Sequence, residues 1–184
     1  ISLGNDGDFQ DRRFVDIINN DLANTIGNLL NRTTSMSRKW FDNKVPINNE
    51  ITSESKLECL AKTSVENYIN KFNTYKLDQA ANEVLNLAIN TNLYLNENQP
   101  WLLIKENDKL PFVQEIIYNV LESTRIIGLL LLPLLPELSS KINLQLGSIY
   151  QKDFSWEQQL KWGLLISNTN LPKPIPIINK LEYE

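Results

Sequence analysis

Four polar residues near the N-terminus are spaced so that a single helix would carry them on one face. Asp21, Asn24, Asn28 and Arg32 follow one another at intervals of three, four and four residues, and side chains at such intervals are neighbours on an α-helix. A carboxamide and a guanidinium one turn apart offer hydrogen-bond donors and acceptors to a base edge, which is how side chains read unpaired RNA. Because a polar face is also typical of a solvated helix, the spacing alone leaves both interpretations open.

A second candidate for chemistry is Trp101, which follows the polar run Asn96 to Pro100. Because proline interrupts helices, we expect the indole to lie where one helix ends and the next segment starts. Most tryptophans pack in a core or an interface, and we assign Trp40, Trp156 and Trp162 to packing. An aromatic ring displayed at a break in the chain can also stack on an unpaired base, with a gain of about 1–3 kcal/mol.

The residue types needed for independent catalysis are scarce. The chain has no His and one cysteine, Cys59, so an internal disulfide and a cysteine-based zinc cluster are excluded, and the commonest acid-base catalyst is missing. We predict no catalytic residue, metal site or cofactor site in this chain. The formal net charge of −4 is the wrong sign for a protein that grips nucleic acid mainly through phosphates, so any RNA contact must be local.

Apolar spacing in this chain of 184 residues predicts helices and no β-sheet. Asp108 can cap one helix, and Gly147 suits the C-terminal end of another. The three prolines within Leu171 to Pro176 require an extended segment. We expect this C-terminal tail to wrap back over the bundle. One more helical turn or two could form over 156–163. The five main predicted helices cover approximately residues 11–37, 53–72, 77–94, 108–132 and 137–146.

The longest apolar run, Ile126 to Leu135, is about half of the ~20 residues that cross a bilayer. We interpret it as buried core or as an interface, and we predict no membrane contact. The first residues lack the basic start and apolar stretch of a signal peptide, and the chain does not begin with Met. We therefore expect a trimmed fragment of a cytoplasmic or organellar protein.

Several motifs resemble one known family. The segment Asp21 to Arg32 closely resembles the "DLAN.LGNLL.R" helix of methionyl-tRNA synthetases. Ser2 to Phe9 match the "GNDGDF" segment that joins this helix to the catalytic half in that family. Asn92 to Lys105 resemble "N.Y....PW...K", and Trp162 to Glu182 resemble the ending "W..L..G..I..P.PLF.RIE". The resemblance covers essentially the whole chain, although Ile175-Pro176-Ile177 stands where Leu-Phe-Pro is common.

The resemblance implies an all-α fold, the anticodon-binding helical bundle of class I aminoacyl-tRNA synthetases, with about five helices and an extended C-terminal tail. It assigns residues 1–10 to the junction with the catalytic half and residues 11–184 to the anticodon-binding domain, with the tail starting at about 164. In that family the matching asparagine and arginine bond the anticodon CAU, and the matching tryptophan stacks on its first base. The implied anticodon-binding residues are therefore Asn28, Arg32 and Trp101, with Asn24 and Lys105 as candidate neighbours.

The resemblance also implies partners. They are the anticodon loop of tRNA(Met) and a catalytic Rossmann domain of the same parent chain, which carries "HIGH" and "KMSKS" signatures absent here. ATP and Mg are implied for that catalytic half and for no part of this fragment. Two alternatives remain: the anticodon-binding domain of a related synthetase for Cys, Val, Ile or Leu, and a helical module that binds a protein partner through Ile126 to Leu135.

Overall fold

The computed structural model describes residues 7–47, 55–147, 150 and 153–182. Over these residues the chain folds into helices without a strand, and extended backbone pairs only in an isolated antiparallel bridge between Lys44 and Asn170. The predicted all-α class is confirmed. Most of the predicted junction segment and Ser53, the predicted start of the second helix, lie outside the described residues.

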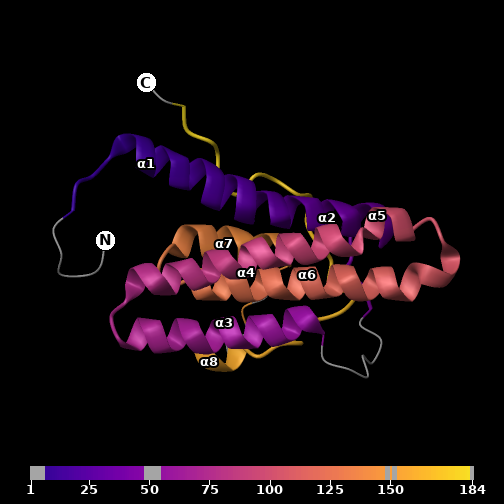
Figure 1. Ribbon diagram of the computed structural model, residues 1–184. Helices are drawn as coiled ribbons and strands as arrows, with labels where there is room; N and C mark the ends of the chain where they lie inside the picture. The colour runs from indigo at the N-terminus through magenta and orange to yellow at the C-terminus, as the bar shows by residue number, and fades with distance from the viewer. Residues whose placement is uncertain (1–6, 48–54, 148–149, 151–152, 183–184) are drawn as a thin grey trace.

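The first predicted helix is one continuous path along the side of the bundle (Figure 1). It begins as α1 (Asp11–Asp16), continues as η1 (Ile17–Gly27) and ends as α2 (Asn28–Trp40). Segment η1 is wound as a π-helix, in which backbone hydrogen bonds span five residues instead of four. The prediction of a regular α-helix is therefore wrong for this segment, and the helix also continues past its predicted end.

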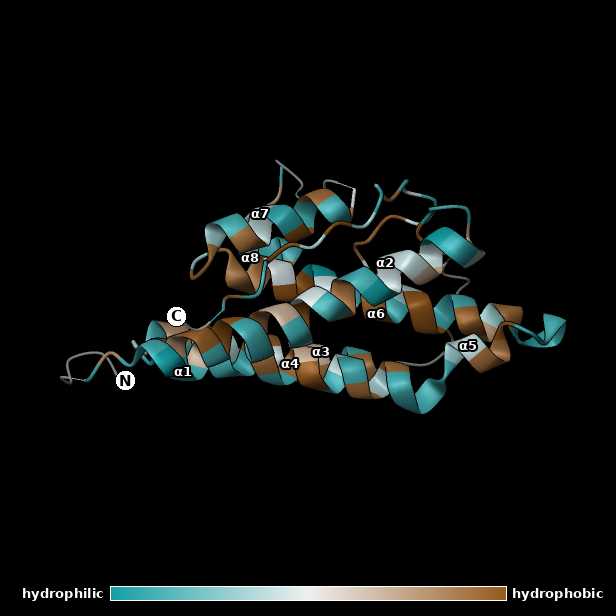
Figure 2. Ribbon diagram, turned by 90° about the horizontal axis from the view of Figure 1, so that it is seen from above, coloured by the Kyte–Doolittle hydropathy of each residue, from teal (hydrophilic) through white to brown (hydrophobic). Residues whose placement is uncertain are grey.

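The next two helices form an antiparallel hairpin, in which α3 (Lys56–Asn73) packs along α4 (Leu77–Asn98) (Figure 1). The Ser55 side chain caps α3 by accepting a hydrogen bond from the Glu58 N–H at 3.0 Å. Hydrophilic and hydrophobic residues alternate along α4 (Figure 2), as expected for a helix with one face in the core. Helix α4 extends one turn beyond the predicted end, which carries it to the start of the Trp101 segment.

Helix α6 (Leu110–Leu131) lies in the middle of the bundle and contacts α2, α3, α4 and α7. It is buried continuously from Ile116 to its end, as expected for a helix that is covered on all sides. The short helices α5 (Pro100–Leu103) and η2 (Asn107–Lys109) connect it to α4. Asp108 provides no side-chain cap for α6, so that expectation is wrong. In the described part of the chain, every helix is too short or too polar to cross a bilayer.

The C-terminal part adds two shorter helices, α7 (Pro136–Gln145) and α8 (Trp156–Gln159). Gly147 follows α7 with a φ of +87°, which confirms the predicted glycine at this helix end. A Cβ atom there would lie 2.6 Å from the Thr169 Cγ2 atom and 3.0 Å from the Asn170 carbonyl oxygen. Backbone conformation and close packing both require glycine at this position.

A buried ion pair fixes the start of the tail to the middle of α6. The Arg125 guanidinium donates to both carboxylate oxygens of Glu122, at 2.8 and 2.7 Å, and both side chains are almost fully buried. Arg125 also donates, at 2.6 Å each, to two carbonyls at the end of α8 and just after it, those of Gln159 and Lys161. Glu122 accepts from three successive backbone N–H groups, those of Gly163, Leu164 and Leu165.

The last described residues run back along η1, which confirms the expected wrapping of the tail. The Asn19 side chain donates to the Leu181 carbonyl at 2.9 Å and accepts from the Leu181 N–H at 2.8 Å. A Cβ atom on Gly27 would lie 3.7 Å from Ile177 and 3.8 Å from Ile178, so the tail approaches the helix closely at this glycine. Both contacts hold the tail beside the helix that carries Asn28.

Tyr68 on α3 is fully buried, and its hydroxyl has no hydrogen-bond partner among the described residues. Burial raises the pKa of Tyr68 to about 12. Unfolded tyrosine ionises near pH 10. Below pH 10 Tyr68 is neutral in both states, and its titration leaves the free energy of unfolding unchanged. As the pH rises from 10 toward 12 the unfolded state ionises first, so the free energy of unfolding decreases. At neutral pH we expect Tyr68→Phe and the unaltered chain to have the same free energy of unfolding. Between neutral pH and about pH 11.5, this free energy should fall by about 2 kcal/mol less in Tyr68→Phe than in the unaltered chain. Unfolding curves at both pH values test this, and equal alkaline losses would contradict it.

Candidate nucleic-acid interface

Arg32 and Trp101 come together from separate helices. Arg32 lies on α2, one turn after Asn28, and Trp101 lies on α5. The Cζ atom of Arg32 is 5.8 Å from the centroid of the Trp101 ring, which is within the range of a cation–π contact. The three residues predicted to bind an anticodon thus occupy two neighbouring elements.

The backbone at the end of α4 positions Trp101. Gln99 has a left-handed conformation, with φ 44° and ψ 54°, and Pro100 then begins α5. The break predicted before Trp101 is therefore present, because Gln99 turns the chain and proline starts the new helix. The indole is half-buried and packs against the hydrophobic core. The side chain thus combines packing with a partly open face, the two interpretations that the sequence left open.

Asn96 holds Arg32 in place, and sequence reasoning missed this partner. The Nη2 atom of Arg32 donates to the Oδ1 atom of Asn96 at 3.0 Å. One turn earlier on α4, the Asn92 side chain donates to the Thr25 carbonyl of η1 at 3.2 Å, which fixes α4 beside this helix. A guanidinium carries five N–H donors, so Arg32 keeps donors for a ligand. The only signal of this contact in the sequence was the spacing of four residues between Asn92 and Asn96, which places both on one face of α4.

The remaining candidates are exposed. Asn28 and Asn24 both lie on the surface, and Asn24 donates to the Asn20 side chain at 3.3 Å. Lys105 is exposed in the turn after α5, four residues beyond Trp101. Asn28 makes no side-chain hydrogen bond to any described residue, so its amide is free to bind a ligand.

Asp21 does not belong to this polar face. It borders an apolar hollow of about 610 Å³ together with Ile17 and Leu85, whereas Asn24 and Asn28 line a separate groove. The predicted stripe from Asp21 to Arg32 is therefore wrong at its first member. The physical reason is the π winding of η1, because a spacing derived from 3.6 residues per turn does not hold there.

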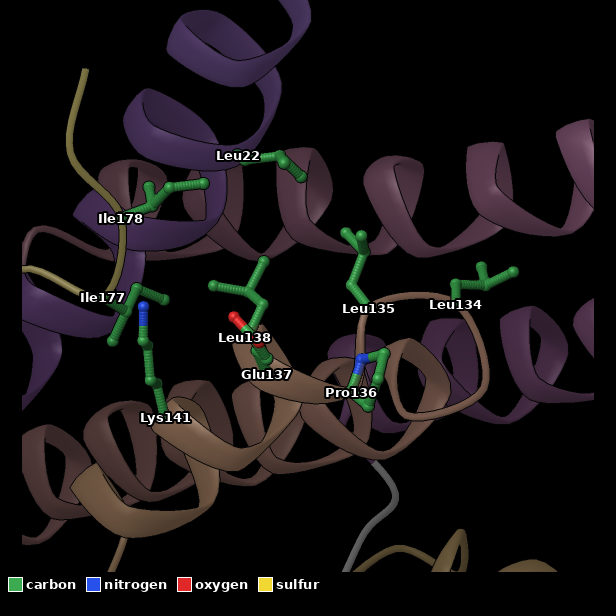
Figure 3. A pocket seen from close by; sticks show the side chains of 9 residues that line it. All are labelled: Leu22, Leu134, Leu135, Pro136, Glu137, Leu138, Lys141, Ile177 and Ile178. Carbon is green, nitrogen blue, oxygen red and sulfur yellow. The ribbon is translucent and has the colours of Figure 1, made fainter. Parts of the chain in front are cut away.

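Most of the surface that could have bound a protein partner, the run from Ile126 to Leu135, is buried. Residues from Ile126 to Leu131 are buried inside the bundle, as the interpretation of a buried core predicted. Leu134 and Leu135 do reach a hollow of about 450 Å³. Figure 3 shows that side chains from η1, the turn after α6, α7 and the tail surround it, including Leu22 and Ile178.

Comparison with known proteins decides the family. A family model described as "Anticodon binding domain of methionyl tRNA ligase" matches residues 45–179. The chain belongs to this family. The predicted resemblance to methionyl-tRNA synthetases is thereby confirmed, and the related synthetases for other amino acids are set aside.

Relatives also cover the first helix, which precedes the family match. Methionine–tRNA ligase of Synechocystis sp. is 35% identical over 99% of this chain and 36% of its own length. The ligase of Thermosynechococcus vestitus is 37% identical over 98% of the chain and 36% of its own length. The ligase of Halalkalibacterium halodurans is 33% identical over 100% of the chain and 28% of its own length. The chain thus spans about a third of the curated ligases it matches.

Solved structures of methionyl-tRNA synthetases share this fold. The apo enzyme of Mycobacterium tuberculosis superposes with a TM-score of 0.89 at 27% identity, covering 100% of this chain and 37% of that enzyme. The same enzyme bound by methionyl-adenylate gives a TM-score of 0.87 at 29% identity, covering 97% of this chain and 35% of that enzyme. The anticodon-binding bundle inferred from sequence is therefore the observed fold.

Proposed function

We propose that this chain reads the CAU anticodon of tRNA(Met) through Asn28, Arg32 and Trp101. The observation that carries the proposal is the restrained Arg32 guanidinium, placed between Asn96 and the Trp101 ring. An arginine already held in position loses less conformational freedom on binding than a mobile one. Its remaining N–H groups and the free Asn28 amide present donors and acceptors to the edge of an unpaired base.

Trp101 supplies the complementary contact. The open part of its ring stacks on the first anticodon base, while the rest of the indole stays packed on the bundle. Asn24 and Lys105, which are both exposed, act as neighbouring contacts. Recognition then depends on a small polar and aromatic surface, which is compatible with the net charge of −4.

In the complete ligase, this chain serves as the recognition part of an enzyme that attaches methionine to tRNA(Met) with ATP. Residues 11–184 form the anticodon-binding domain, and residues 1–10 lead to the catalytic Rossmann domain. Among the described residues, no three His, Cys, Asp or Glu side chains are grouped so that they could hold a metal ion. We assign the chemistry of ATP and Mg to the catalytic domain.

The test is a titration of the 184-residue chain with an RNA stem-loop that carries the CAU anticodon. We expect saturable binding, and much weaker binding of a hairpin with the same stem and an unrelated loop, because the proposed contacts go to unpaired bases. Equal affinity for the two hairpins would contradict recognition of the loop.

A further inference from the structure

An open groove of about 340 Å³ runs along the helix on the side of Asn28 that faces the tail. Asn24, Asn28 and Asn31 line it from the helix, and Pro176 and Lys180 line it from the tail. Asn28 therefore belongs to two surfaces at once: it is one turn from Arg32, and it forms part of this groove. We call the second surface the tail groove.

The tail groove has a defined shape because the tail is fastened to the helix at two points. Beyond the groove, Leu181 forms two hydrogen bonds with the Asn19 side chain. Near its middle, Ile177 is buried against the helix, where Gly27 allows the close approach. The position of Lys180 next to Leu181 is thus set by the fold.

The charge along the tail groove differs from that of the whole chain. Its lining contains three asparagines and one lysine, and no carboxylate. Lys180 is exposed and forms no ion pair with any described residue. The Nδ2 group of Asn31 is free to donate, because only its Oδ1 atom is engaged, by the Ser35 hydroxyl at 3.3 Å. In a protein of net charge −4, this is a local surface of donors and positive charge.

We propose that the tail groove binds the sugar–phosphate backbone of the RNA strand beside the anticodon. Lys180 contacts a phosphate, and the Asn24 and Asn31 amides bond ribose or phosphate oxygens, as protein groups commonly do when they position a strand without reading its bases. This inference rests on the proposed function, since the base bound at Asn28 brings its own backbone to the groove.

The test compares Lys180→Gln with Lys173→Gln, which removes the same charge from an exposed position of the tail outside the groove. We expect Lys180→Gln to weaken binding of the CAU stem-loop about two- to fivefold. The slope of log affinity against log salt should become shallower by about 0.7, the contribution of one phosphate on a single strand. Lys173→Gln should change neither quantity, and Lys180→Arg should restore both.

The outcomes separate the two proposals. If the unaltered chain does not bind the stem-loop, the proposed function and this inference both fall. If Arg32→Ala weakens binding while Lys180→Gln does not, only the tail groove is wrong. Equal effects of Lys180→Gln and Lys173→Gln would indicate general attraction and would also overturn the inference. Because a phosphate contact carries no sequence information, a change in anticodon preference caused by Lys180→Gln would contradict it as well.

Discussion

Replacing Glu122 with glutamine is expected to destabilise the chain by about 3–5 kcal/mol, the usual cost of breaking a buried ion pair. Arg125 would be left without its counter-charge in the middle of α6, and the three tail N–H groups bound to the carboxylate would lose part of their acceptor. For a domain of this size the melting temperature should fall by roughly 10 °C. Chemical denaturation, followed by circular dichroism, measures the change.

Glu157→Gln is the matched control, because this glutamate is exposed on α8. It should remain within about 0.5 kcal/mol of the unaltered chain. Hydrogen exchange adds a local measurement: the amides of Gly163 to Leu165 should exchange faster in Glu122→Gln than in the control. A Glu122→Gln chain as stable as the control would show that the pair does not fasten the tail.

Replacing Trp101 with alanine should weaken binding of the CAU stem-loop by about 1–3 kcal/mol, which is roughly one to two decades in affinity. The variant loses the stacking surface, and Arg32 loses one of the two groups that restrain it. Because the indole is half-buried, the stability should also fall, but by less than the ~3–5 kcal/mol of a fully buried aromatic side chain. Both quantities must be measured on the same variant, under conditions where it is folded.

Trp156→Ala controls for that loss of stability. Trp156 is also half-buried, and its Nε1 atom donates to the Leu129 carbonyl at 2.8 Å. Figure 1 shows its helix, α8, on the opposite side of the bundle from α5. We expect Trp156→Ala to lose stability and keep its affinity for RNA. If both variants lose affinity in proportion to their stability, Trp101 is a packing residue only.

Features that depend on local spacing were predicted well from the sequence. The apolar pattern located α6 and α7 closely, and Gly147 marked the end of α7, because periodicity and backbone conformation are properties of neighbouring residues. The polar run before Pro100 likewise indicated the break that places Trp101. The choice of Asn28, Arg32 and Trp101 itself came from the family motif.

Features that depend on distant segments were not predicted. Apart from the spacing of Asn92 and Asn96, nothing in the sequence indicated that Asn96 would hold Arg32, because the contact arises when α4 packs against η1 and α2. Glu122 and Arg125 were missed because their role requires tail carbonyl and N–H groups that return from far along the chain. The π winding of η1 was also missed, since an apolar pattern read at 3.6 residues per turn assumes the α-helix in advance.

The most direct measurement of anticodon reading is a ratio of two dissociation constants. One is for a stem-loop whose first anticodon base is changed, and the other is for the CAU stem-loop with the same stem. We expect the changed loop to bind about 1–3 kcal/mol more weakly to the unaltered chain, a ratio of roughly 5 to 150. In Arg32→Ala the ratio should move toward one. A ratio of one for the unaltered chain would contradict the proposal that Asn28, Arg32 and Trp101 read the anticodon.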